Sequence, residues 1–422
     1  MVGPVTRGAR RLLTDIRPLR ASADYRRLWL GSTVSQLGQQ MTAVTIAIQV
    51  FAISRSTFAV GLVGLFALVP LVTFGLYGGA FADAMDRRKL ALVASCGLWA
   101  SSLLLVAHAA LGRESVWFLY AVVALQGGFF AVNSPTRSAI IPRLLGKDLL
   151  PAANALNMAS FNLGFTVGPL LGALAIGAGG YTFAYAIDAV TFTAALYSVY
   201  RLPAMPPQAP TGDELQRPGL RSVVEGLRFL KGARNLSMTF LLDICAMVLA
   251  QPRALFPAVA GEFFGGGVRT VGLLQAAPAI GALVAFTFSG WVGKIRRQGL
   301  AIALCVITYG AAVTAFGFAR ALWLGVLFLA LSGAADMVSS AYRSTILQVA
   351  APDHLRGRLQ GVFIVVVAGG PRLGDFVAGS TAALLTPTIA LAGGGIACMV
   401  GVLLFSAWQR RFLRYDAEDP QP

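Results

Sequence analysis

Six ionisable side chains stand inside long apolar stretches of this 422-residue sequence. They are Asp188, Asp243, Arg253, Asp336, Arg372 and Asp375. A charged residue near the centre of a membrane helix costs roughly 2.5–3.5 kcal/mol on insertion scales, so such residues should face a lumen and be paired. Arg372 and Asp375 are three residues apart, which on a helix places them within reach of each other.

A buried carboxylate of this kind could carry protons. Burial disfavours its charged form and a neighbouring Arg favours it, so an acid whose Arg partner moves away would bind and release a proton. We expect the six residues to serve coupling or cargo binding, with Asp243 the first candidate for the coupling acid, followed by Asp336 and Asp375. The alternative for any one of them is a static structural pair.

Neutral polar side chains accompany these charges. Gln36 and Gln40 follow one helical stripe, and Asn157 stands in a later apolar stretch. Amides that face a cavity could hydrogen-bond a polar cargo, so these three are predicted to bind substrate. They could equally hold helices together.

The composition places the whole chain in a membrane. Hydrophobic residues make up 56% of the sequence and charged residues 12%, with a mean hydropathy of +0.71. A soluble domain is about one-quarter charged. An unfolded tail, a disulfide scaffold and a soluble enzyme are therefore excluded, and lipid is the expected solvent.

The apolar segments occur as six, a polar gap and six more, which predicts an all-α membrane protein with twelve spans in two six-helix bundles. The expected spans are 27–53, 58–82, 91–111, 116–142, 152–176, 181–201, 236–260, 270–292, 299–319, 321–343, 359–383 and 387–408. The predicted units are an N-terminal segment 1–26, a bundle 27–201, a linker 202–235, a bundle 236–408 and a tail 409–422. The linker should contain a basic amphipathic helix over 220–231, lying at the inner membrane surface.

The positions of Lys and Arg predict the orientation. The net charge is +16, but 28 of the 34 basic residues fall in alternate segments that include both termini, and four fall in the other loops. Basic residues gather on the cytoplasmic side. Both termini are therefore expected in the cytoplasm, the protein in the inner membrane, and no nucleic acid among its partners.

Motifs for other chemistries are absent from the sequence. The four cysteines stand singly, and the two histidines lie in different halves, so no metal site is expected. The sequence contains no phosphate-binding Gly-x-x-x-x-Gly-Lys-Ser/Thr loop and no hydrolase motif. We expect neither an enzyme nor a cofactor, and a proton gradient as the energy source. A channel, a receptor or a transport-dead sensor or scaffold is the remaining alternative.

The two halves repeat each other. The segment 124–140 returns at 330–346, an offset of 206 residues, and Gly168-Pro169-Leu170-Leu171-Gly172 returns as Gly370-Pro371-Arg372-Leu373-Gly374. Two repeats joined by a linker are typical of secondary transporters that rock about a site at the membrane midplane.

The loop between the second and third spans carries a family motif. Residues 78–89 contain a Gly-x-x-x-Asp pattern followed by basic residues, and resemble the signature of the major facilitator superfamily. The matching positions are Gly79, Asp83, Arg87 and Arg88, whereas Met85, Asp86 and a missing glycine depart from the pattern. The resemblance implies that Asp83 and Arg87 are gating residues that latch the two halves in the outward-facing state. The alternative is that Asp83 only caps the third span.

A second motif lies in the fifth span. Gly164, Gly168, Pro169 and Gly172 resemble the motif associated with exporters of this superfamily. Ordinary close packing of helices is the alternative, since small residues at this spacing are common in membranes. The fourth span has Val123 where exporters of this kind have an Arg, which argues against a proton relay there.

Several strings in the second half, together with Asp188, resemble the enterobactin-exporter branch of the superfamily. They are Leu242-Asp243, residues 251–257, 335–337 and 342–348, and 370–375. The resemblance implies export of a siderophore-, drug- or metabolite-like molecule by proton antiport. We expect a monomer whose partners are a small-molecule substrate, protons and membrane lipid. Uptake or facilitated diffusion is the alternative.

Overall fold

The computed structural model describes residues 15–206, 228–230, 232–289, 295–350 and 353–416, apart from the side chains at 76–84, 348, 350 and 353–365. Helices make up the regular structure of these residues, and their only β contact is an isolated bridge between Arg297 and Asp416. The predicted amphipathic helix over 220–231 falls almost wholly outside the described residues.

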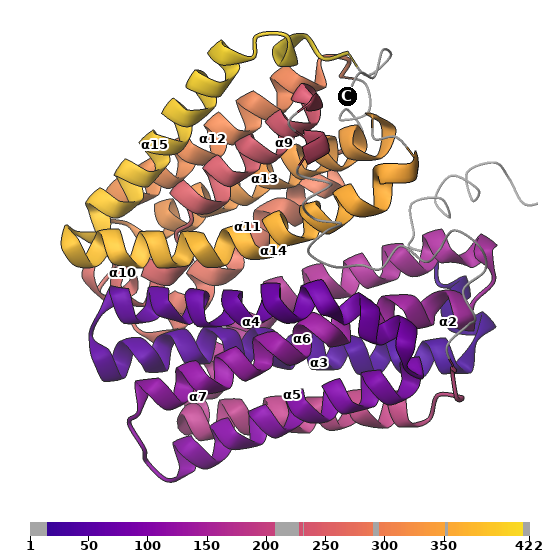
Figure 1. Cartoon of the computed structure of the whole chain (residues 1–422). Coiled ribbons are helices and arrows are strands. Elements are labelled where there is room, and N and C mark those ends of the chain that lie inside the picture. Colours follow the sequence, from indigo (N-terminus) through magenta and orange to yellow (C-terminus); the bar gives the residue numbers. More distant parts are fainter. Residues whose placement is uncertain (1–14, 207–227, 231, 290–294, 351–352, 417–422) are drawn as a thin grey trace, which may run out of the picture.

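The N-terminal bundle is built from long helices that follow the expected spans, preceded by one short helix (Figure 1). They are α2 (Arg17–Ala21), α3 (Ala23–Ser54), α4 (Thr57–Ala84), α5 (Arg87–Ala110), α6 (Val116–Leu144) and, after the short helix η1 (Lys147–Leu149), α7 (Leu150–Tyr200). The ends are set by local chemistry. Ser22 caps α3, for example, by accepting the backbone N–H of Tyr25.

Helix α7 supplies two spans. Its 51 residues correspond to roughly 75 Å at 1.5 Å per residue, which is more than twice the thickness of the hydrocarbon core. The helical dihedral angles are lost at Gly179 and Gly180, and Gly180 has a φ of 71° that favours glycine. The predicted division into 152–176 and 181–201 therefore corresponds to a turn at these two glycines.

The C-terminal bundle contains the second set of helices. They are α9 (Arg234–Ile244), η3 (Cys245–Leu249), η4 (Arg253–Leu255), α10 (Phe256–Glu262), α11 (Val268–Thr287), α12 (Gln298–Phe318), α13 (Leu322–Ala350), α14 (Asp353–Leu384), α15 (Pro387–Trp408) and η6 (Phe412–Arg414). Ten segments of the described chain are long and apolar enough to cross a membrane. Helix α7 counts once among them although it contains two spans, and α14 is not one of the ten, so the arrangement is compatible with twelve crossings.

The seventh span is broken, whereas the sequence predicted one continuous segment over 236–260. Its α-helix becomes a π-helix at Cys245–Leu249, and regular structure stops at Ala250 before resuming as a 3₁₀ turn at Arg253. Pro252 removes one backbone donor at the break. Gly374 of α14 packs directly against this segment, where an added Cβ would lie 2.7 Å from the Cβ of Gln251.

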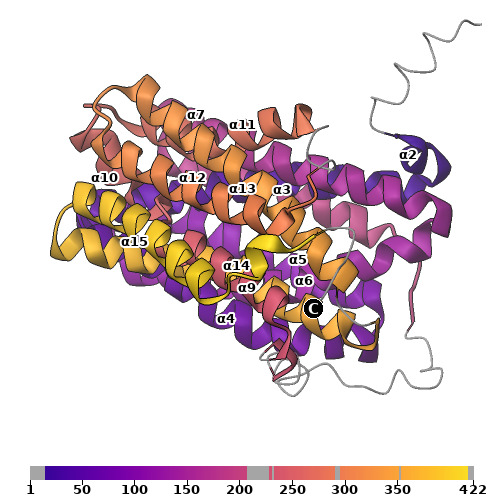
Figure 2. The same cartoon turned by 90° about the horizontal axis from the view of Figure 1, so that it is seen from above.

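The two bundles lie side by side, and α14 runs along α4 where they meet, whereas α15 is tilted against that direction (Figures 1 and 2). They meet through α4 against α14 and through α7 against α11. We call the end that carries Arg55 and the turn at Gly179–Gly180 the distal end, and the opposite end, where the chain leaves α7 for the linker, the linker end. Near the distal end, Val44 and Ile48 of α3 join the same hydrophobic cluster as Val259 of α10.

Glycines bring the bundles close together along α4 and α14. A Cβ on Gly61 would lie 3.2 Å from the Cα of Gly379, and the Thr57 hydroxyl donates to the Gly379 carbonyl over 3.1 Å. The boundaries of the five predicted units remain predictions, although the helices group into bundles as expected.

Candidate transport site

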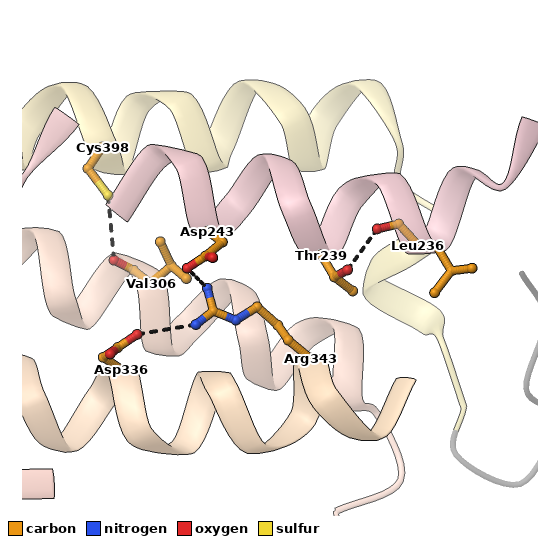
Figure 3. Close-up of polar contacts among 7 residues, drawn as sticks. All are labelled: Leu236, Thr239, Asp243, Val306, Asp336, Arg343 and Cys398. Carbon is orange, nitrogen blue, oxygen red and sulfur yellow. Dashed lines mark hydrogen bonds and ion pairs between the residues drawn. The ribbon is translucent and has the colours of Figure 1, made fainter. Parts of the chain in front are cut away.

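Two of the predicted acids are joined by an arginine inside the C-terminal bundle (Figure 3). Asp243 stands near the end of α9, just before the π-helix, and Asp336 lies midway along α13. Nη1 of Arg343 donates to Asp243, and Nη2 donates to Asp336 over 3.2 Å. We call these three residues the ion cluster.

The geometry of α13 explains how Arg343 reaches both acids. Arg343 lies two turns after Asp336, a rise of about 10 Å, and side chains on a helix point back toward its N-terminus. The guanidinium fork can bind two carboxylates at once, which a lysine cannot do with fixed geometry. Helix α9 supplies the second carboxylate from the opposite side.

The 28 basic residues counted toward the cytoplasmic side include Arg343 and Arg137, whose side chains the structure places in the interior of the bundles. Both lie inside helices, Arg343 in α13 and Arg137 in α6. Arg343 is the member of the ion cluster that was not among the predicted site residues. The available signal was its place in the internal repeat, since two arginines 206 residues apart at the end of matching apolar segments predict matching positions in the two bundles.

The ion cluster holds one more acid than base. Asp243 and Arg343 have side chains exposed by 4% and 6%, whereas that of Asp336 is 37% exposed. Burying an unpaired charge costs several kcal/mol. A cluster of two carboxylates and one guanidinium therefore becomes neutral when one proton binds, and Asp336 is the more accessible acid.

Asp188 lies in the other bundle, away from the ion cluster. Its Oδ2 accepts hydrogen bonds from the Thr42 hydroxyl of α3 over 2.8 Å and from the Ser102 hydroxyl of α5 over 2.7 Å. The residue is fully buried, and its Oδ1 has no hydrogen-bond partner. No ion pair reaches Asp188 from any residue that the structure describes.

Arg137 is the counterpart of Arg343 in the N-terminal bundle. Its guanidinium donates to the Ser32 hydroxyl over 2.5 Å, to the Ser95 hydroxyl over 3.2 Å and to the side-chain oxygen of Asn133 over 3.2 Å. All three acceptors are neutral. Within the described part of the chain no carboxylate pairs with Arg137.

Arg253 lies where the two bundles meet. It begins the 3₁₀ turn after the break in the seventh span, and its guanidinium carbon lies 5.6 Å from the ring centroid of Phe165 in α7. This cation–π contact joins side chains from opposite bundles. It is the kind of contact that changes when the bundles move apart.

Arg372 and Asp375 do not form the ion pair that their spacing predicted. Arg372 donates through Nη1 to the carbonyl of Ala368, one turn earlier on α14. Asp375 lies near both Arg372 and Arg253, but no ion pair joins it to a described residue, and its Oδ1 is buried without a hydrogen bond. The backbone of α14 thus competes with Asp375 for the arginine.

The glycines of the fifth span pack against α3. An added Cβ would lie 2.8 Å from Gln36 at Gly164, 2.5 Å from Gln40 at Gly168 and 3.1 Å from Met41 at Gly172. The close helix packing expected from their spacing is therefore present. Their association with export remains a prediction.

The three predicted substrate amides lie on α3 and α7. Gln36, Gln40 and Asn157 are all half-buried. No described residue forms a hydrogen bond with any of the three amides. The stems of the two glutamines support the packing of α3 on α7, and substrate binding by the three amides remains a prediction.

The loop after α4 differs from its prediction. Asp86, not Asp83, caps α5, because its Oδ1 accepts the backbone N–H groups of Arg88 and Lys89. The surroundings of Gly79 and the side chain of Asp83 lie outside what the structure describes. An acid directly before a basic helix start was the signal for this cap.

The described contacts of Arg87 and Arg88 stay on the N-terminal side of the chain. Arg87 donates to the Ala139 carbonyl of α6 over 3.0 Å, and Arg88 donates to the Tyr200 carbonyl of α7 over 2.6 Å. In this conformation the two arginines do not latch onto a described residue of the other bundle.

A cavity of about 570 Å³ lies between the bundles at the distal end. Its walls come from both halves and include Phe51, Arg55, Tyr181, Pro257, Glu262 and Val271. It is mostly apolar, with one basic and one acidic side chain from opposite bundles. Among the described residues no group of three or more potential metal ligands occurs.

Comparison with known proteins decides the family. The model of a family described as "Transmembrane secretion effector" matches residues 13–422. The chain belongs to this family of the major facilitator superfamily. It is a transporter rather than an enzyme, and a multi-pass membrane protein with a small-molecule substrate.

Curated relatives match along nearly the whole chain. The enterobactin exporter EntS of Escherichia coli O1:K1 is 28% identical over 396 residues, and that of Shigella boydii serotype 18 is 29% identical. Each alignment covers 93% of this chain and 93% of the relative. The predicted resemblance to this branch is confirmed.

Solved structures show the same fold at low sequence identity. The nucleoside transporter NupG is 13% identical with a TM-score of 0.70, covering 92% of this chain and 98% of its own. A bacterial homologue of the iron transporter ferroportin in an inward-facing state is 15% identical with a TM-score of 0.67, covering 93% and 98%. The predicted fold class is confirmed.

Proposed function

We propose that this transporter exports a siderophore-like small molecule across the inner membrane by proton antiport, with both termini in the cytoplasm. The family description and the name of the curated relatives support export. The excess of basic residues on the side of the termini supports the orientation, and removing Arg137 and Arg343 from that count leaves the excess intact.

The main support for proton coupling is the unbalanced charge of the ion cluster, in which two carboxylates share one guanidinium. One guanidinium balances one carboxylate, so either Asp243 or Asp336 is left as an excess negative charge. A proton on that acid removes the excess. The cluster is therefore a site at which the bundle gains or loses a proton, depending on which side of the membrane water reaches.

Exchange at the cluster would follow from the position of Arg343. When Arg343 binds both acids, each carboxylate is favoured as the ion, and the proton leaves. When a movement of α13 against α9 separates the guanidinium from one acid, that acid is buried alone and takes up a proton. Alternating access couples this switch to cargo movement.

The contacts between the bundles suit such a movement. Among the described residues the bundles meet through faces that carry glycines and few hydrogen bonds, and Arg87 and Arg88 form their hydrogen bonds with the N-terminal bundle. Alternating access requires the linker end and the distal end to open in turn. The cavity at the distal end then lies on the path by which cargo leaves.

Vesicles with an imposed pH gradient test the proposal. Metabolite profiling of a deletion strain identifies the retained compound, and reconstituted protein should move that compound opposite to the proton flux. Asp243→Asn should leave the protein folded and abolish proton-driven transport, while Asp24→Asn, near the linker end of α3, should transport normally.

Two outcomes would contradict the proposal. Unchanged proton-driven transport in Asp243→Asn removes the ion cluster from coupling. Flux that follows the cargo gradient alone, with no dependence on the pH gradient, indicates uptake or facilitated diffusion instead.

A further inference from the structure

Asp188 presents a buried carboxylate that the ion cluster does not explain. It is fully buried in the N-terminal bundle, and both of its hydrogen bonds come from hydroxyl groups, those of Thr42 and Ser102. Both bonds end on the same oxygen. Its Oδ1 is left without any partner.

The described titratable groups on the helices that contact Asp188 form no ion pair with it. On α7 itself, Tyr185 lies one turn earlier, and its hydroxyl donates to Gln49 of α3 over 2.7 Å. On α5, His108 is stacked against Phe118, and neither of its ring nitrogens has a hydrogen-bond partner. The structure describes no Lys or Arg within ion-pair distance.

Arg137 is held apart from Asp188 by the same two helices. Helix α3 presents Ser32 to Arg137 and Thr42 to Asp188, while α5 presents Ser95 to Arg137 and Ser102 to Asp188. Ser95 and Ser102 are two turns apart, or about 10 Å along the helix. Arg137 and Asp188 therefore lie in separate polar sites, and each is hydrogen-bonded to hydroxyl groups instead of an oppositely charged side chain.

The free oxygen of Asp188 has little space around it. An added Cβ on Gly38 would lie only 2.5 Å from Oδ1, so α3 closes that side of the carboxyl group. A metal cation needs several oxygen ligands arranged around it. A proton needs only the bare oxygen, and it removes the charge that burial disfavours.

We propose that Asp188, Thr42 and Ser102 form a second proton-binding site, which is occupied in this conformation. Oδ1 carries the proton, and Oδ2 accepts the two hydroxyl hydrogen bonds. The site is in the bundle opposite to the ion cluster. Its protonation does not depend on the proposed function, whereas its use in the transport cycle does.

Infrared difference spectroscopy of the purified protein tests this assignment. The spectrum of the wild type minus that of Asp188→Asn should contain the carbonyl-stretch band of one protonated carboxyl group at neutral pH. A pair of carboxylate bands in its place would overturn the proposal. Asp24→Asn is the matched control, and its difference spectrum should show the carboxylate bands of an acid that is ion-paired with Arg27.

A second pair of variants keeps the acid in place. Thr42→Val and Ser102→Ala each remove one hydroxyl donor, so each should move the carbonyl band to higher frequency while retaining it. If neither variant moves the band, Asp188 is not its source. These variants also decide the question if Asp188→Asn does not fold.

Exchange with solvent separates a proton site from a permanently locked acid. After transfer of the wild type to heavy water, the Asp188 band should shift to lower frequency within the time of several transport cycles. A band that never shifts overturns the proposal. Proton-driven transport by Asp243→Asn is measured in a separate assay. If the antiport mechanism fails there, the spectra still show whether Asp188 is protonated.

Discussion

The two bundles hold their matching arginines in opposite ways. Arg137 in α6 and Arg343 in α13 are 206 residues apart in an internal repeat, and both reach into the interior of their bundle. Arg343 binds two carboxylates, whereas Arg137 binds two serines and an asparagine.

If the ion cluster exchanges a proton as proposed, this difference separates a fixed charge from an exchangeable one. The neutral acceptors of Arg137 have no charge to lose, so the N-terminal site has no reason to bind a proton at the arginine. The carboxylates of the ion cluster compete for one guanidinium, and each can be neutralised. The two bundles are therefore similar repeats, and among the described residues only the C-terminal arginine is paired with acids.

Replacement of the two arginines should give the largest difference in stability between the bundles. Arg343→Gln leaves two carboxylates in the bundle without a counter-ion and should cost about 3–5 kcal/mol of stability. Arg137→Gln leaves only hydroxyl and amide groups behind and should cost about 1–2 kcal/mol. Thermal unfolding of the purified variants measures both.

A rescue variant provides the control for this prediction. Adding Asp243→Asn and Asp336→Asn to Arg343→Gln removes both orphaned charges and should recover most of the lost stability. Equal destabilisation by Arg343→Gln and Arg137→Gln would show that the carboxylates are not charged partners of the arginine.

Replacement by lysine should have an intermediate effect. Lysine keeps the charge but lacks the planar fork, so Arg343→Lys should lose one charge-assisted hydrogen bond, at about 1.5–3 kcal/mol. Arg137→Lys should lose less, because serine hydroxyls rotate to meet an ammonium group. Unfolding temperature and the pH dependence of transport distinguish the two, since only Arg343→Lys should change the pH profile.

The smallest expected effect comes from a single acceptor of Arg137. Ser95→Ala removes one hydrogen bond to the guanidinium and should lower stability by about 1 kcal/mol with transport retained. Loss of proton coupling in Ser95→Ala would mean that the N-terminal arginine takes part in the proton pathway. In that case the contrast between the bundles would disappear.

The sequence predicted most of the fold because membrane spans have a simple physical signal. Long apolar segments and the positions of basic residues are set by lipid, and the repeat located the two bundles. The division of α7 into two spans was also predicted from the apolar pattern, and the structure has non-helical dihedral angles there at Gly179 and Gly180.

The broken seventh span and the ion cluster needed the structure. Pro252 was visible in the sequence, but a proline can also bend a continuous helix, and the packing of Gly374 against the break depends on another span. Asp243 and Asp336 were predicted as a set with no named partner. Arg343 was counted with the cytoplasmic residues because a basic residue near the end of a span more often lies at the membrane surface.

The fifth span contacts a helix of its own bundle on one side and a helix of the other bundle on another. Gly164 and Gly168 contact α3, while the Pro169 carbonyl lies where a Cβ on Gly272 of α11 would come within 3.1 Å. A methyl group added on the side that faces α3 would push this part of α7 toward α11 in the other bundle. Small changes inside one half of the protein should therefore alter how freely the halves slide past each other, even at positions that cargo never touches.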